Sequence, residues 1–423
     1  MVLSSDEQLA RLRRYYPPAA DVAVVAGDPC LDRLNASHHL RDAYRAALGV
    51  EPDRRLVVLS STWGSRSLDG RLPGLALQLA AELPLDRYAL VLALHPNVWH
   101  WHSPYQVRAW MAPYRRAGVA LLPPEEGWQA AVVAADLVVG DHGSVMFYAA
   151  AADRPIAFAV VEPSELDPAS PMARLLVAAP RLDPSQPLRH QLDAVIRDPQ
   201  HHRYVHLTAE ASSAPGQSAA LIRALLYEQL RLPEPSAPAR TPIVPIPRSP
   251  DPTPVTATVM TTVHHRDVVA VERYPAALRL DDPPDGVTHL SVAWRHDDPQ
   301  LLAAADTVVA TIEDTAGRPR RWIRSALGRL PGCTLAAVAL TASTSLIGTR
   351  SGQLFVARVT VGAPDAACVT AGVLALLANR STPPVFTLVV GARRHRVRLT
   401  PVATTHPARI RTRRTAERER PDH

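Results

Sequence analysis

The stretch Ala-Ala-Asp-Leu-Val-Val-Gly-Asp-His-Gly-Ser-Val, residues 134–145, decides the fold of the first half of this chain. Its apolar run at 137–140 is typical of a short strand that is buried on both faces. A polar turn follows, and residues 144–151 then have the pattern of a helix. Because strand, turn and helix follow one another closely, the stretch predicts one unit of a parallel sheet with helical crossovers.

The same unit recurs on both sides of this stretch. Further buried strands are predicted at 22–26, 56–60, 88–94, 118–122 and 156–160, and helices at 73–83, 105–117, 127–134 and 217–230. Ligands of such sheets bind beyond the carboxyl ends of the strands. The loops that follow the strands are therefore where functional residues are expected.

The chain divides into five predicted segments. They are an N-terminal lead (1–20), a Rossmann-like α/β domain (21–230), a Pro-rich linker (231–255), an α+β domain (256–401) and a disordered Arg-rich tail (402–423). The linker has nine prolines in 25 residues, which favours an extended, semi-rigid segment that packs no core. In the α+β domain, strands are predicted at 256–263, 268–274, 287–294, 335–341, 354–361 and 385–390, and helices at 299–311, 319–330 and 366–379.

Composition limits the class of protein. The 423 residues carry a net charge of +6, and all 46 basic residues are Arg. Residues 393–423 alone have a net charge of +7, so the other 392 residues are nearly neutral at −1. The three cysteines lie far apart, which argues against a zinc ribbon, an iron–sulfur site or a disulfide scaffold. The start has no secretory signal pattern and no apolar run approaches 18 residues, so a cytoplasmic location is expected.

Three loops after predicted strands carry residues suited to a phosphate. The first contains Ser61, Thr62 and Arg66, the second contains His95 and Asn97, and the third contains Asp141, His142, Gly143 and Ser144. Hydroxyls, glycine amides and Arg donate the hydrogen bonds that phosphate oxygens accept. In the third loop Asp141 could cap the following helix, whose free amides at 143–145 would form an anion site.

Each loop also has a purely structural explanation. Asp-x-Gly-Ser before a helix is often only a cap, and a Ser/Thr/Gly stretch is often only a turn. A metal site built from His95, His100, His102, Asp141 and His142 is a sharper rival, although their spacing is not that of a helical ligand pair. A Ser-His-Asp hydrolase is a weaker one, because the sequence has no G-x-S-x-G turn.

These loops resemble the carboxyl-terminal half of GT-B-type transferases, specifically the CDP-glycerol glycerophosphotransferase family. UDP-GlcNAc 2-epimerases share the broad pattern. The resemblance spans about 21–230, and four segments carry it: 27–32 (GDPCLD), 59–63 (LSSTW), 94–96 (LHP), and 135–145 running on through Tyr148 to 153–156. The last resembles the family's A-D-x-x-[IV]-T-D-Y-S-S pattern and is the most specific.

The resemblance implies that this half binds a nucleotide diphosphate. Thr62, His95, Asp141, Gly143 and Ser144 would line the pyrophosphate and ribose, and His95 would stabilise the departing phosphate. The chain departs from the family pattern where the loop Arg is Gly64, where Tyr-Ser is His142-Gly143, and where an Asp is Tyr148. Only about 20 residues precede the matching half, whereas a GT-B active site lies between two domains.

The expected function is therefore a transferase-like protein that binds a nucleotide-activated glycerol phosphate, polyol phosphate or sugar. His95 and Asp141 are the expected catalytic residues, and no metal is required, although Mg²⁺ could accompany the nucleotide. A separate chain could supply the missing GT-B half. The alternatives are a non-catalytic nucleotide- or phosphate-binding regulator or scaffold, and a tail that touches nucleic acid or an anionic membrane non-specifically.

Overall fold

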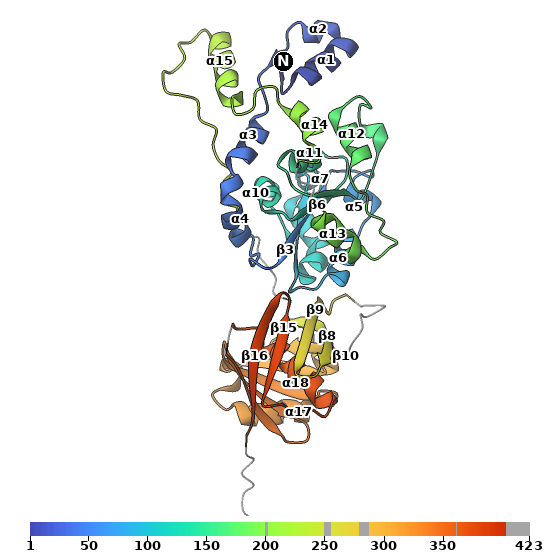
Figure 1. Ribbon diagram of the computed structural model, residues 1–423, viewed down its shortest axis with the longest axis vertical. Helices are drawn as coiled ribbons and strands as arrows, with labels where there is room; N and C mark the ends of the chain where they lie inside the picture. The colour runs from blue at the N-terminus through green and yellow to red at the C-terminus, as the bar shows by residue number, and fades with distance from the viewer. Residues whose placement is uncertain (199–201, 249–254, 279–286, 361, 403–423) are drawn as a thin grey trace, which may run out of the picture.

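The computed structural model describes residues 1–198, 202–248, 255–278, 287–360 and 362–402 (Figure 1). These residues form an α/β unit and a β-rich unit, and Figure 1 shows the second lying below the first. The predicted disordered tail falls outside the described residues from 403 onward.

The first unit is built on a five-stranded parallel sheet in the order β5-β4-β3-β6-β7. Its strands are β3 (Arg55–Ser61), β4 (Tyr88–Leu94), β5 (Val119–Leu121), β6 (Leu137–Gly140) and β7 (Ile156–Phe158). The Rossmann-like parallel sheet is thus confirmed. Their apolar side chains alternate between two cores, one on each face of the sheet.

The predicted first strand of this sheet is wrong. Val24 and Val25 form β2 (Val24–Val25), which pairs with β1 (Val2–Leu3) in a separate two-stranded ribbon. Val22 and Val24 are exposed, so this run lacks the double-sided burial of the central strands. The N-terminal segment is itself ordered, because Ser5 caps helix α1 (Asp6–Tyr15).

Helices cover both faces of the sheet (Figure 1). Besides α1, the α-helices of this unit are α2 (Pro17–Ala20), α3 (Pro29–Ala36), α4 (Arg41–Ala47), α5 (Leu68–Arg71), α6 (Leu75–Glu82), α7 (Pro96–His102), α8 (Pro104–Trp110), α9 (Ala112–Arg116), α10 (Trp128–Ala134), α11 (Ser144–Ala151), α12 (Pro171–Ala178), α13 (Leu188–Arg197), α14 (Val205–Thr208) and α15 (Ser218–Leu230). Of these, α1, α2 and α15 lie apart from the sheet, at the top of Figure 1. The single helix predicted at 105–117 is broken into α8 and α9 at Met111, next to Pro113.

Asp136 fixes the register between β3 and β6. Its backbone amide donates to the Leu56 carbonyl at 2.9 Å, and its carboxylate accepts from the Leu56 amide at 2.7 Å. The same carboxylate pairs with Arg41 and with the buried Arg45. Asp306, in the similar stretch Ala-Ala-Asp-Thr-Val-Val, binds Leu290 in the same way. Its amide donates to the Leu290 carbonyl at 2.9 Å, and its carboxylate accepts from the Leu290 amide at 2.8 Å.

The Pro-rich linker has no helix or strand in its described part, but the prediction that it packs no core is wrong. Val244 is buried against the first unit, and its carbonyl accepts from the Tyr44 hydroxyl at 2.6 Å. Its amide donates to the Ser37 hydroxyl at 2.8 Å. This part of the linker therefore packs against α3 and α4.

The second unit is a closed barrel in the order β10-β11-β12-β13-β14-β16-β15-β9-β8. Its strands are β8 (Ala257–His265), β9 (Val268–Pro275), β10 (Val287–Ala293), β11 (Thr307–Thr311), β12 (Leu335–Thr341), β13 (Thr344–Thr349), β14 (Leu354–Val359), β15 (Val385–Val390) and β16 (Arg393–Pro401). Helix α18 (Ala366–Ala378) packs against the inward-facing residues of most of these strands. The α+β class is confirmed.

One prediction in the barrel needs correction, and two of its strands were missed. The helix predicted at 299–311 ends early as α16 (Pro299–Ala304), and its second half is β11, which pairs in parallel with β10 and β12. Strands β13 and β16 were not predicted. In β16 the buried His395, Val397 and Leu399 alternate with exposed Arg side chains, so part of the Arg-rich C-terminal stretch belongs to a strand. Helix α17 (Pro319–Arg329) lies where predicted.

The barrel docks on the amino ends of the first unit's strands. Arg273 of β9 pairs with Asp86, just before β4, at 2.6 Å, and Arg393 of β16 pairs with Asp53, just before β3, at 2.7 Å. At Gly391, which has a φ of +60°, an added Cβ would lie 2.5 Å from the Asp86 carbonyl oxygen. The carboxyl ends of the sheet point away from this junction (Figure 1).

We expect Asp136→Ala to destabilise the first unit by about 3 kcal/mol, because it leaves the buried Arg45 without its carboxylate. Denaturant unfolding measures the change. As a control, Asp42→Ala at an exposed position of α4 should shift stability by less than about 0.5 kcal/mol. Equal effects of the two substitutions would contradict the bracing role of Asp136.

His289 should make the stability of the barrel depend on pH. Burial lowers the pKa of His289 from 6.5 to about 4, against the opposing effect of Asp306. Since the unfolded histidine takes up a proton first, stability is full above pH 6.5 and falls as the pH drops toward 4, by up to about 3 kcal/mol. Unfolding of the natural chain and of His289→Asn between pH 7 and 4 should differ in this slope; parallel curves would refute it.

Candidate functional site

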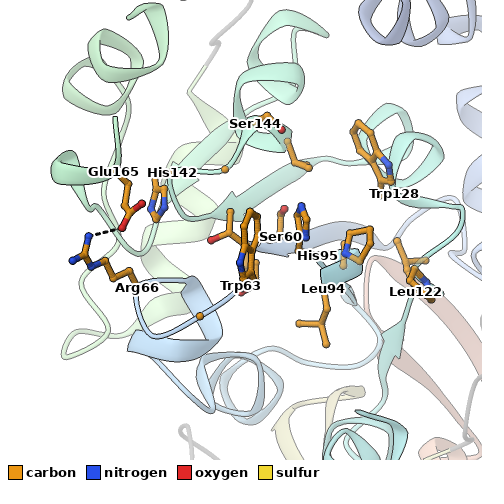
Figure 2. A pocket seen from close by; sticks show the side chains of 18 of the residues that line it. Ser60, Trp63, Arg66, Leu94, His95, Leu122, Trp128, His142, Ser144 and Glu165 are labelled. Carbon is orange, nitrogen blue, oxygen red and sulfur yellow. Dashed lines mark hydrogen bonds and ion pairs between the residues drawn. The ribbon is translucent and has the colours of Figure 1, made fainter. Parts of the chain in front are cut away.

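A cavity of about 730 Å³ opens at the carboxyl ends of β3, β4, β5 and β6. Figure 2 shows its lining side chains converging from the loops after these strands. Of the nine predicted site residues, seven line it: Ser61, Thr62, Arg66, His95, His142, Gly143 and Ser144. Asp141 and Asn97 stand behind this lining, and each positions a lining residue.

Asp141 is a structural centre of the site. Its carboxylate is almost fully buried, and one oxygen accepts from the Thr62 amide (2.8 Å), the Thr62 hydroxyl (2.7 Å) and the Leu68 amide (2.7 Å). The other oxygen accepts from the Gly143 amide at 3.0 Å. These four bonds hold the 62–68 loop against the turn before α11. The N-cap of α11 is Gly143, which has no capping side chain.

The amino end of α11 faces the cavity through Ser144 and Val145. The first amides of a helix have no partner within it, and the helix dipole favours an anion there. The Gly143 amide is already used by Asp141. Fewer free amides are therefore available to an anion than the three that were predicted at 143–145.

His95 is held in one tautomer. It caps α7, and its Nδ1 accepts from the Asn97 amide at 3.1 Å. Burial lowers the pKa of His95, although Asp141 acts in the opposite direction, so the ring is neutral near pH 7. A neutral imidazole whose Nδ1 accepts carries its proton on Nε2. His95 therefore offers an N–H donor, and Trp63 stacks on it with ring centroids 4.2 Å apart.

Arg66 lies at the rim, half exposed. Its guanidinium pairs with Glu165, as the dashed line in Figure 2 shows. Glu165 is the one carboxylate among the residues that line the cavity. The positive charge of Arg66, in the predicted phosphate loop, is thus already paired with the Glu165 carboxylate.

Sequence reasoning missed the apolar side of the cavity. Leu122, Pro123, Pro124 and Trp128 line it, together with Trp63. Pro123 and Pro124 follow the predicted strand at 118–122 directly, so their place at a strand end was the available signal. A polar anion site beside an aromatic and apolar wall suits a ligand that joins a phosphate to a ring.

The rival metal site is not assembled. Among the residues described by the structure, no group of three or more His, Cys, Asp or Glu has the arrangement needed to hold a metal ion. His100 and His102 lie on α7, outside the cavity lining, and His102 packs edge-on against Trp110.

Residues 1–166 match the family model of CDP-Glycerol:Poly(glycerophosphate) glycerophosphotransferase. This confirms the resemblance drawn from the strand-end loops. The match begins at residue 1 and ends at 166, whereas the resemblance was placed at 21–230. The first unit is accordingly similar to this family of transferases over residues 1–166. No curated protein matches the chain.

Three solved structures illustrate the likeness. The wall teichoic acid polymerase TagF, in a variant soaked with CDPG, is 16% identical, with 54% of this chain and 56% of that chain covered and a TM-score of 0.39. WaaG, a glycosyltransferase involved in lipopolysaccharide biosynthesis, is 15% identical, with 54% of this chain and 61% of that chain covered and a TM-score of 0.32. UDP-GlcNAc 2-epimerase from Neisseria meningitidis, bound to UDP-GlcNAc, is 15% identical, with 53% of this chain and 59% of that chain covered and a TM-score of 0.33. The chain thus spans less than two thirds of each.

Within the described residues, no helix is both long and apolar enough to cross a membrane.

We expect Gly143→Ala to weaken pyrophosphate binding at least tenfold. The new Cβ would lie 2.6 Å from Thr62 Cγ2 and 3.1 Å from an Asp141 oxygen, so the 62–68 loop must shift. Calorimetry with inorganic pyrophosphate measures the loss. Gly328→Ala, where a Cβ meets nothing within 4 Å, is the matched control and should bind normally. Unchanged binding in Gly143→Ala would refute the assignment.

Proposed function

We propose that the first cavity binds CDP-glycerol or a closely related nucleotide-diphosphate conjugate, and that the chain takes part in transferring the glycerol phosphate, polyol phosphate or sugar to an acceptor. The observation that carries this proposal is the convergence of two donor groups on one cavity: the His95 Nε2–H and the amino end of α11. The family match of residues 1–166 supports the same substrate class.

For a CDP-glycerol donor, an acceptor hydroxyl oxygen would attack the phosphorus that carries the glycerol. A new P–O bond forms, the bond to the bridging oxygen breaks, and CMP leaves with that electron pair. The role of the chain is electrostatic, because its donors face the place where charge develops on the leaving phosphate. His95 donates through Nε2, and α11 contributes its amides and dipole.

The acceptor must lose a proton, and the described lining offers no free carboxylate to take it. Glu165 pairs with Arg66, and Asp141 is saturated by the 62–68 loop and Gly143. The barrel lies at the opposite edge of the sheet, so it does not cover the cavity. We therefore infer that a separate chain or domain supplies the acceptor side, as expected for the other half of a GT-B enzyme.

The surface at that end of the first unit suits such a partner. Large apolar side chains are exposed along α1, α2 and α15, where Figure 1 places the N-terminus. They include Tyr15, Tyr16, Leu221, Leu226 and Leu230. Exposed apolar side chains gathered at one end of a molecule are candidates for an interaction surface.

The residues present do not fit a resident Mg²⁺. Such ions are usually held by one or two carboxylates together with substrate phosphates. The single lining carboxylate, Glu165, is already paired with Arg66. Mg²⁺ that arrives with a nucleotide would rest on the phosphates alone, and no step of the proposal uses it.

The second candidate function is a nucleotide-binding regulator or scaffold without turnover. The saturation of Asp141 favours it, because both carboxylate oxygens already accept hydrogen bonds from the chain itself and neither faces a substrate proton. Release of CMP from CDP-glycerol, measured with a glycerol phosphate acceptor, separates the two candidates. Binding without CMP release under any acceptor condition would favour the regulator.

The cytoplasmic location, the weak contact of the Arg-rich tail with an anionic membrane or nucleic acid, and placement at the inner face of the membrane remain part of the proposal. The tail contact and the placement at the membrane rest on the +7 net charge of 393–423. Flotation with anionic vesicles, before and after deletion of 402–423, is the direct measurement.

Binding of CDP-glycerol should strengthen as the pH falls from 8 to 5.5. The pKa of His95 is lowered in the free protein, and a bound diphosphate would raise it, so binding takes up a proton. CDP-glycerol suits this test because it has no terminal phosphate that titrates near pH 6, unlike CDP. Calorimetry should show at least tenfold weaker binding for His95→Ala and a flat pH profile. If calorimetry detects no binding of CDP-glycerol to the natural chain, the proposal is wrong.

A further inference from the structure

The barrel holds a second cavity that the transferase-like site does not use. It has a volume of about 580 Å³, within the range of small-molecule sites. It lies at the carboxyl ends of the parallel strands β10, β11 and β12, where Ala293, Thr311 and Ala339 line it. Ligands of parallel sheets bind at this edge.

Small side chains keep this cavity open. Ala293 pairs with Val309 and Thr311 pairs with Ala339 in the strand register, and all four line the space. Ala366 and Ala367, in the first turn of α18, face them. Since protein interiors are otherwise closely packed, this run of small residues provides room for a molecule other than the chain itself.

The charges of the lining do not suit an anion. Arg273 is held by Asp86 at 2.6 Å and by Asp365 at 2.7 Å, and Arg295 is paired with Asp314. Glu313 adds a further carboxylate. Every lining cation that the structure describes is thus paired, and acids outnumber bases, so phosphate would be repelled.

The inner end of the cavity carries hydroxyls and lies beside buried polar groups that have no partner. Thr258 and Ser291 line it and stand opposite each other in the strand register. Ser291 also pairs with Thr307, whose buried hydroxyl has no hydrogen-bond partner, and His289, two residues along β10, has none on either ring nitrogen. His289 is only 5% exposed. Buried groups in this condition call for water or a polar ligand.

An aromatic wall completes the cavity. Trp294 lines it and is fixed by Trp322, which packs edge-on with ring centroids 5.2 Å apart, and by Arg329, 4.8 Å from its ring centre. A rigid indole offers apolar contact, while hydroxyls and carboxylates accept hydrogen bonds from hydroxyl groups. We propose that this cavity binds an uncharged sugar, held on Trp294 and hydrogen-bonded by Ser291, Thr258 and Glu313.

The proposal is independent of the nucleotide site and is tested on the full chain with glucose, galactose and N-acetylglucosamine as probes. Saturation-transfer NMR should show binding of at least one of them at millimolar concentration. Ser291→Ala and Glu313→Gln, which change no packing, should each weaken it at least threefold, and Ala339→Leu should abolish it by filling the space. Ser61→Ala, in the first cavity, is the matched control and should bind the sugar normally.

Three outcomes would overturn the proposal. The first is that none of the three sugars binds at 20 mM, roughly the weak limit of small-ligand affinity. The second is that Ser291→Ala and Glu313→Gln bind like the natural chain. The third is that glucose 1-phosphate competes better than glucose, because the paired arginines should give its charge no advantage.

Discussion

The candidate site depends on one buried carboxylate. A charge placed in the interior costs far more than it returns unless every lone pair finds a donor. Asp141 meets this requirement by drawing in the Thr62 amide and hydroxyl, the Leu68 amide and the Gly143 amide. In doing so it brings the ends of β3 and β6 together and sets the shape of the space between them. Asp141 therefore shapes the cavity from behind its lining.

Sequence patterns predicted which loops meet at one cavity, because parallel sheets constrain where strand-end loops lie. Five of the six predicted strands of the first unit lie in one sheet, so loops at 60–67, 95–97 and 141–145 had to converge. The roles within the site were harder to predict. Whether a carboxylate faces the ligand or the backbone depends on loop conformation, and the sequence pattern of Asp141 is the same in both cases.

The barrel was predicted less completely for a different reason. The run 307–311 is short and mostly apolar, and short apolar runs do not distinguish a buried strand from a buried helix. Asp306 ends α16 there by bracketing Leu290, as Asp136 brackets Leu56 in the first unit. The six-residue likeness around these two residues thus marks a shared device for starting a parallel strand. Strand β16 was not predicted because its many Arg side chains obscure the alternation of buried and exposed residues.

The direction of β16 sets how far Pro401 lies from the candidate cavity. The strand begins at Arg393, beside Asp53 at the junction of the two units, and runs to Pro401 on the far side of the barrel. At about 3.4 Å per residue, that places Pro401 roughly 27 Å beyond the junction. The cavity opens at the opposite edge of the sheet. Pro401 therefore lies at the end of the molecule opposite the candidate cavity.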